Sequence, residues 1–307
     1  MKTHSHNHRP FHFATLALAG AAFFSFAGFG WSQSNPTAQS LPYSQNFGTS
    51  TFTSLPAGWA AWLAGGNKTT QSAAETGTPG GDDTLTTATA STTTGGLYGY
   101  AVSSNAQLYL QESSSSTKGT PTVAFAFNTG SATSVTISYD LSLINGGVTT
   151  QDYGHALQYR SGTTGSFTTI TGSPMTFGAV TSYTTTTRSF TVTGLTSNTD
   201  YQLRIITWRP SGSGSSKGIG IDNFSISVPV SIPTLTTPTV TSIGTTSATL
   251  GANVTANGGA TLTSRGTVWG TTAAPTGNSL AEGGTATGTF THSRTGLTAN
   301  TAYVFRR

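Results

Sequence analysis

Most of the chain alternates apolar and polar residues with a period of two, the pattern of β-strands that bury one face. No window sustains the 3.6-residue period of a helix. Many short strands bounded by glycine, serine, asparagine and threonine are typical of a β-sandwich or jelly roll, so the predicted fold class is all-β. The clearest alternating runs are residues 123–127, 135–143, 190–192 and 201–205.

One predicted strand breaks its own alternation. In the stretch GIGIDNFSIS, residues 218–227, Ile219 and Ile221 have odd numbers, whereas Phe224, Ile226 and the following Val228 have even ones. A shift of one residue turns every side chain to the other face, so one regular register does not bury all five. We therefore predict a β-bulge at Asp222–Asn223, with Asp222 as a structural carboxylate at the kink and calcium ligation as the competing interpretation.

The apolar stretch near the start and the proline-rich stretch after residue 228 predict the domain organisation of the chain. Residues 1–32 combine Lys2 and Arg9 with an apolar run and then small residues, which predicts a signal peptide cleaved between about Gly30 and Ser34. An uncleaved anchor is the alternative, but the apolar run is shorter than the roughly 20 residues of a membrane span. The expected order is then a linker at 33–40, a jelly-roll β-sandwich at 41–228, a proline-rich linker at 229–238 and an incomplete immunoglobulin-like (fibronectin type III-like) β-sandwich at 239–307.

A nine-residue stretch occurs twice. TGLTSNTDY at 193–201 returns as TGLTANTAY at 295–303, with a tyrosine six residues after the leucine in both copies. This spacing predicts two tyrosine corners, Leu195/Tyr201 and Leu297/Tyr303, in which the tyrosine hydroxyl bonds upstream backbone. The alternative is two similar hairpin loops in a threonine-rich chain.

Three motifs together resemble a known family. LPYSQNF, LPAGWAAW and GIGIDNFSIS occur in the order expected of the cleaved-adhesin or choice-of-anchor-type jelly-roll module, which the chain resembles over about residues 41–228. Residues 234–307, with TTSATLGANVTANGG and TGTFTHSRTGLTANTAY, resemble the fibronectin type III-like repeats of bacterial surface proteins. The resemblance implies extracellular spacers and glycan- or protein-binding modules, and it carries over no catalytic residues. The repeat stops at Arg307 before a last strand, so we expect it to be truncated, with an anchor or an enzyme domain to follow.

The composition of the chain excludes several kinds of site and one class of partner. Only 7% of the residues are charged, against about 25% in an ordinary domain. No cysteine is present, which excludes disulfides, thiolate metal sites and a cysteine nucleophile. The net charge is +4, but the basic residues stand singly, so no nucleic-acid partner is expected.

The chain offers little for catalysis. After the leader only His155 and His292 remain, in different predicted domains, and no G-x-S-x-G, H-E-x-x-H or Walker motif occurs. We therefore expect no enzyme within these residues, and we expect His155 to be a strand residue.

Binding sites are harder to choose from the sequence. Sugars need exposed aromatic faces beside polar groups, and we select Trp62, Tyr98 and Tyr153 as candidates, although most aromatic residues must lie in the core. No cofactor is predicted; if a metal binds, structural calcium fits best, with Asp222, Asp140 and Asp152 as candidate ligands.

These patterns favour a secreted or cell-surface, non-catalytic adhesion or carbohydrate-binding module with a sandwich spacer. The alternatives are the non-catalytic front of a larger secreted hydrolase and a structural surface-layer or matrix protein. The expected partner is a polysaccharide or a surface glycoprotein, and the mature chain is not expected to span a membrane.

Overall fold

The computed structural model describes residues 33–64, 67–90, 92, 94–112, 120–145, 152–178, 184–211, 217–281 and 283–306. The signal peptide predicted for residues 1–32 lies outside these ranges. Within them the chain forms strands and a single short helix, α1 (Gln71–Glu75). The prediction of an all-β sandwich fold is therefore confirmed. Among the same residues, no helix is both long enough and apolar enough to cross a membrane.

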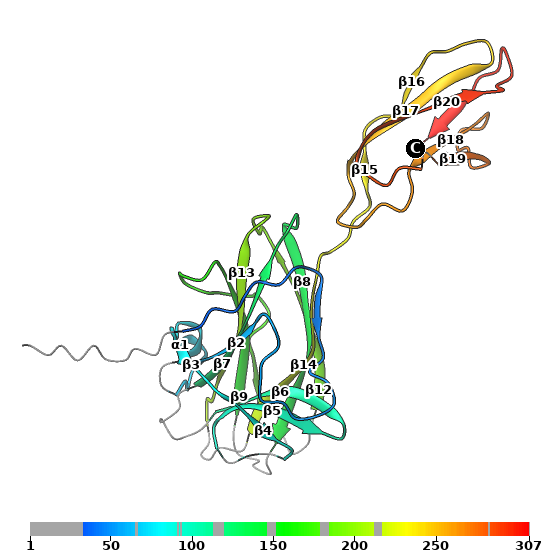
Figure 1. Cartoon of the computed structure of the whole chain (residues 1–307). Helices are drawn as coiled ribbons and strands as arrows, with labels where there is room; N and C mark the ends of the chain where they lie inside the picture. Colours follow the sequence, from blue (N-terminus) through cyan, green and yellow to red (C-terminus); the bar gives the residue numbers. More distant parts are fainter. Residues whose placement is uncertain are drawn as a thin grey trace, which may run out of the picture. The chain divides into compact units, whose positions relative to one another are not determined.

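The first sandwich consists of two seven-stranded sheets (Figure 1). We call them the β8 sheet and the β13 sheet. In order, the β8 sheet contains β12 (Thr184–Thr193), β8 (Ser134–Asn145), β14 (Lys217–Ser227), β6 (Asn105–Gln111), β5 (Gly96–Val102) and β4 (Leu85–Ala88), with β1 (Tyr43–Gln45) along β14. The β13 sheet contains β10 (Thr168–Thr169), β9 (Tyr153–Ser161), β13 (Asp200–Trp208), β7 (Thr120–Asn128), β2 (Trp59–Ala64) and β3 (Pro79–Asp82), with β11 (Met175–Phe177) along β9.

The core lies between these two sheets. Alternate residues of β8 and β13 point inward, as their period of two predicts. Aromatic rings fill the centre: Trp59 lies 4.8 Å from Phe224 and 5.2 Å from Phe125, centroid to centroid. A buried core of this size explains how the sandwich holds together without disulfides.

The outer face of the β13 sheet is covered as well. Trp62 on this face is completely buried and donates from Nε1 to the carbonyl of Ser34 at 2.9 Å. Gln39 forms a parallel bridge with Phe127 and donates its N–H to the carbonyl of Ala126. The segment expected to be a linker at 33–40 thus hydrogen-bonds along the sheet.

The bulge predicted in β14 is confirmed. Asp222 pairs with Asp140 of β8, but the next pair is Ser225 with Ser138, so two residues of β14 face one residue of β8. Asn223 takes up the irregularity with a φ of 45°, in the left-handed region that asparagine tolerates. The shift in register buries four of the five apolar residues, namely Ile219, Ile221, Phe224 and Ile226, and Val228 is half-buried.

The second sandwich has two smaller sheets. One contains β15 (Thr234–Leu235), β17 (Ser247–Ala256), β16 (Thr239–Thr241) and β20 (Gly288–Thr295), and the other has the order β19 (Asn278–Ala281), β18 (Gly266–Gly270), β21 (Val304–Arg306). Strand β15 lies inside the expected proline-rich linker and pairs with β17. Strand β21 pairs with β18 in antiparallel register, with Phe305 opposite Trp269.

Both predicted tyrosine corners are present. The hydroxyl of Tyr201 accepts the backbone N–H of Thr196 at 3.0 Å, and the hydroxyl of Tyr303 accepts that of Thr298 at 3.0 Å. The repeated sequence therefore builds the same local structure in both sandwiches.

Candidate functional site

The three aromatic residues selected for sugar binding are buried, and this corrects the prediction. Trp62 and Tyr153 have 0% exposed surface and Tyr98 has 7%. Their polar atoms are also engaged, because Tyr98 donates to the carbonyl of Thr94 and Tyr153 to that of Leu110. None of the three offers an open ring face to a sugar, because Tyr153 lies in the core between the sheets and the other two rings are buried on the outer faces.

The three aspartates selected as calcium ligands do not come together. Asp140 and Asp222 face each other across β8 and β14, whereas Asp152 accepts a hydrogen bond from Ser211 elsewhere. Asp140 accepts from the Thr187 hydroxyl at 2.6 Å and the Asn223 amide at 2.8 Å.

Hydrogen-bond donors also occupy Asp222. Its Oδ1 accepts the N–H of Asn223 at 2.7 Å, and the Asn105 side chain donates to it as well. Burial raises the pKa of this carboxyl above its usual range. No group of three or more acids or histidines gathers among the described residues. The arrangement suits a hydrogen-bonded bulge better than a calcium site.

Two buried titratable groups lie elsewhere in the first sandwich. Glu112 accepts from the Thr207 hydroxyl at 3.1 Å, and burial raises the pKa of its carboxyl to about 7. His155 lies on β9, as expected, with Nε2 2.7 Å from the Tyr139 hydroxyl; burial lowers the pKa of its imidazole to about 3. Glu112 is 2% exposed and His155 is 0% exposed, so both lie inside the sandwich, and we interpret both as structural groups.

The outer face of the β13 sheet carries two buried arginines around one ring. The guanidinium groups of Arg160 and Arg204 lie 4.3 and 4.1 Å from the ring centroid of Phe167. Arg204 also donates to the carbonyls of Glu75 and Gly77, which cap the end of α1. These contacts hold the helix and the Phe167 loop against the sheet, so we interpret the layer as structural.

The second sandwich contains an open hollow that we call the β21 groove, with a volume of about 480 Å³. It lies between the edge strands β16 and β21. The walls are apolar and aromatic, and two of their side chains, Val240 and Ile243, are exposed. The main side chains that line the groove are Val240, Ile243, Leu250, Trp269, Arg294, Leu297, Tyr303 and Phe305.

Of the described residues that line this groove, Arg294 alone is charged. Its guanidinium lies 4.3 Å from the ring centroid of Trp269, and its Nη2 donates to the Thr267 hydroxyl and contacts His292 Nδ1 at 3.0 Å. Its Nε is buried and has no hydrogen-bond partner. Burial of the guanidinium lowers the pKa of Arg294. Among the described residues, none of these contacts of Arg294 is with a carboxylate.

Sequence reasoning missed this groove. The repeated TGLTANTAY stretch supplies Leu297 and Tyr303, and that repeat was the one available signal. Trp269 and Phe305 lie opposite each other on β18 and β21, a pairing that only the fold makes visible.

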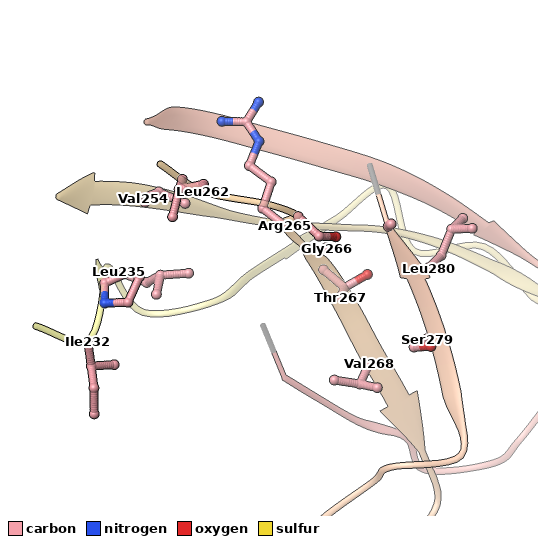
Figure 2. Close-up of a pocket in the computed structure, with 13 residues that line it drawn as sticks. Ile232, Leu235, Val254, Leu262, Arg265, Gly266, Thr267, Val268, Ser279 and Leu280 are labelled. Carbon is pink, nitrogen blue, oxygen red and sulfur yellow. The ribbon is translucent and has the colours of Figure 1, made fainter. Parts of the chain in front are cut away.

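A second hollow in the same sandwich, of about 430 Å³, is shown in Figure 2. Leu235, Val254 and Leu262 gather on one side of it, and the guanidinium of Arg265 lies above these three side chains in the view. That guanidinium donates to the carbonyls of Ala286 and Gly288. This hollow therefore offers apolar contact and little else.

Comparison with known proteins gives distant structural likenesses. No family model matches the sequence, and no curated protein matches it. Among solved structures, the K2 cleaved adhesin domain of Lys-gingipain is 14% identical, with 61% of this chain and 98% of that chain covered and a TM-score of 0.32. A carbohydrate-binding module specific for non-crystalline cellulose, CBM28, is 12% identical over 42% of this chain and 81% of its own, with a TM-score of 0.31.

A third likeness is to the CBM22-1 xylan-binding domain from Paenibacillus barcinonensis Xyn10C. It is 10% identical over 64% of this chain and 97% of its own, with a TM-score of 0.27. All three neighbours are carbohydrate-binding or adhesin modules of the jelly-roll type. At these TM-scores the likeness does not place the chain in a family.

Proposed function

We propose that this protein is a secreted or cell-surface, non-catalytic adhesion module that holds another macromolecule in the β21 groove. The observation that carries the proposal is the groove itself, an open hollow with part-exposed aromatic rings and one guanidinium. Concave apolar sites with a few polar groups are the usual form of binding sites. Exposed apolar side chains at such a site favour contact with a partner.

The proposal assigns different roles to the two sandwiches. The first sandwich buries its aromatic rings and its selected acids, so we assign it a scaffold role. For the second we propose a fibronectin type III-like repeat, supported by the facing of β16, β17 and β20 against β18, β19 and β21 and by a tyrosine corner before β21. The partner class is a polysaccharide or a surface glycoprotein.

A binding screen with two matched variants tests this function. The chain from residue 33 onward is screened against immobilised polysaccharides and purified surface glycoproteins, with Ile243→Ser in the groove and Ile232→Ser outside it. Both isoleucines are highly exposed, at 76% and 87%, so neither change should disturb folding. We expect binding that Ile243→Ser weakens and Ile232→Ser leaves intact. Folded protein that binds no partner, or equal effects of the two variants, would contradict the proposal.

A further inference from the structure

The first sandwich has one long strand at a sheet edge, β12, which lies apart from the groove of the proposed function. We propose that β12 is the interface of a homodimer, in which it pairs antiparallel with β12 of a second copy of this chain across a twofold axis. The β8 sheets of the two copies then join edge to edge.

The first reason is the length and regularity of this edge. Strand β12 pairs with β8 over all ten residues from Thr184 to Thr193 without a shift in register. Among the described residues, no strand pairs with its other side. The strands at the other ends of the two sheets are much shorter, with four residues in β3 and β4, three in β11 and two in β10. Of these edges, β12 therefore offers the longest row of backbone N–H and C=O groups to another strand.

The second reason is that nothing in β12 opposes pairing. Exposed edges usually carry lysine, proline or a bulge, each of which discourages another strand from adding. β12 contains neither lysine nor proline, and Arg188 is its single charged residue. The guanidinium of Arg188 lies 5.1 Å from the ring centroid of Phe190, which packs against the core, and it donates to the carbonyl of Gly172. These contacts hold the charge away from the backbone edge.

The third reason is that the exposed side chains of β12 match one another. The outer face of the strand carries an exposed hydroxyl at every second position, in Thr185, Thr187, Ser189, Thr191 and Thr193. Hydroxyl pairs across two strands stabilise a sheet. The Oγ1 atoms of Thr191 and Thr136 of β8 already form such a pair at 3.2 Å. A second copy offers the same row of hydroxyls in the opposite direction.

The alternation of β12 also selects the register. A twofold axis perpendicular to the sheet keeps inner faces opposite inner faces only if it passes through a residue of the strand. The two registers with the greatest overlap are centred on Arg188 and on Ser189. The first places two guanidinium groups directly opposite each other, which is destabilising. The second pairs Ser189 with its own copy and Thr187 with Thr191. It also places Arg188 opposite Phe190, a favourable pair of cation and ring.

A charge swap at Ser189 tests the interface and the register together. The chain from residue 33 onward, which contains both sandwiches, is prepared unchanged, as Ser189→Lys and as Ser189→Glu, and sedimentation equilibrium gives the dimer dissociation constant. The same two substitutions at Ser44 are the matched control, because Ser44 is an exposed serine on β1, which pairs with β14. Both positions are exposed, so the variants should fold, and circular dichroism verifies this.

We expect the unchanged chain to dimerise as its concentration rises, with slower hydrogen exchange at the amides of residues 184–193. Each Ser189 variant places like charges opposite each other at the axis, so its dissociation constant should rise about fivefold. An equimolar mixture of the two variants places lysine opposite glutamate and should pair at least as tightly as the unchanged chain. The Ser44 variants should dimerise as the unchanged chain does.

The contrary results differ in what they overturn. Protein that stays monomeric at every concentration overturns the inference and leaves solvent or a different protein as the neighbour of β12. A dimer with unaltered exchange at residues 184–193 uses another surface and overturns it as well. Slowed exchange, together with a mixture that pairs no better than either variant alone, overturns the register centred on Ser189. None of these results bears on the proposed function, which Ile243→Ser tests in the β21 groove.

Discussion

At the scale of single residues, Asn223 shows how one side chain can serve both backbone and side-chain demands. Its φ of 45° lies in the left-handed region, and its side-chain amide donates to Asp140 at 2.8 Å. Asparagine tolerates that backbone better than alanine, for which the left-handed conformation costs about 1–2 kcal/mol. Glycine adopts it without steric cost.

We therefore expect Asn223→Ala to lower the free energy of unfolding by about 0.5–1 kcal/mol more than Asn223→Gly, because the flexibility that glycine adds to the unfolded chain offsets part of the steric cost of alanine. Both variants lose the amide bond to Asp140, so their difference isolates the backbone. Urea unfolding measures it. An alanine variant as stable as the glycine variant would show that the bulge relaxes without the left-handed residue.

His155 and Glu112 oppose each other in their dependence on pH. Between about pH 3 and its ordinary pKa of 6.5, His155 is protonated in the unfolded chain but not in the folded one, so stability rises with pH. Between its ordinary 4.5 and about 7, Glu112 is protonated in the folded protein but not in the unfolded chain, so stability falls with pH. The two effects offset each other between about pH 4.5 and 6.5.

Substituting either group should reveal the pH dependence of stability that the other group contributes. In His155→Phe the free energy of unfolding should fall as pH rises from about 4.5 to 7, and in Glu112→Gln it should rise with pH from about 3 to 6.5. Urea unfolding across this pH range gives the slopes, which do not depend on the packing lost in each variant. Parallel curves for the two variants would contradict the assignment.

At the scale of elements, close approach limits the pairing of β9 with β13. Gly154 of β9 lies opposite Trp208 of β13, and a methyl group at Gly154 would lie 1.9 Å from the indole ring. Trp208 is buried against Ala74 of α1, so its ring has little freedom to move.

We expect Gly154→Ala to destabilise the protein by about 1–3 kcal/mol through overpacking. Gly178→Ala is the control, because nothing lies within 4 Å of a methyl group there and its backbone has an ordinary conformation. Thermal unfolding compares the two. Equal melting temperatures would mean that Trp208 moves aside easily.

The two tyrosine corners share a hydrogen bond but differ in exposure. Tyr201 is 6% exposed and stacks on Phe127, whereas the hydroxyl of Tyr303 bonds Thr298 in an exposed loop. Removing the hydroxyl of Tyr201 leaves the N–H of Thr196 without its partner in a part-buried site.

Tyr201→Phe should therefore lower the free energy of unfolding by about 1 kcal/mol, and Tyr303→Phe by less, because water can replace the lost acceptor there. Urea unfolding of the two variants checks the order. A larger effect at Tyr303 would contradict it.

The alternation of apolar and polar residues allowed some features of the fold to be predicted from the sequence. The change of phase between Ile221 and Phe224 was enough to locate the bulge, because one regular strand with a period of two cannot place both residues on its buried face. The repeated Leu–Tyr spacing was enough to locate both corners.

The candidate sites needed more than alternation. The period of two gives the outer face of a strand but not whether other segments cover that face, and Trp62 is covered by the residues around Ser34. The β21 groove likewise depends on how β16 and β21 are arranged at the edges of two sheets. Such long-range arrangements leave no periodic signal in the chain.

At the scale of the whole molecule, low charge leaves polar contacts mostly to amides, hydroxyls and carbonyls. Even the buried guanidinium groups follow this rule: Arg160 donates to the side chain of Gln202 and the carbonyl of Gly165, and Arg204 to the side chain of Gln158 and two carbonyls. Salt screens attraction between ions far more than hydrogen bonds to neutral oxygens.

The melting temperature should accordingly change by no more than about 2 °C between roughly 0.05 and 1 M sodium chloride. Calorimetry at a fixed pH measures it, and a steep decline with salt would reveal ion pairs that matter. A framework of this kind has a consequence for where the protein can work. The stability of its fold should be the same in fresh water and in brine. A change in salinity would then alter the affinity for a charged partner without destabilising the scaffold that presents the binding site.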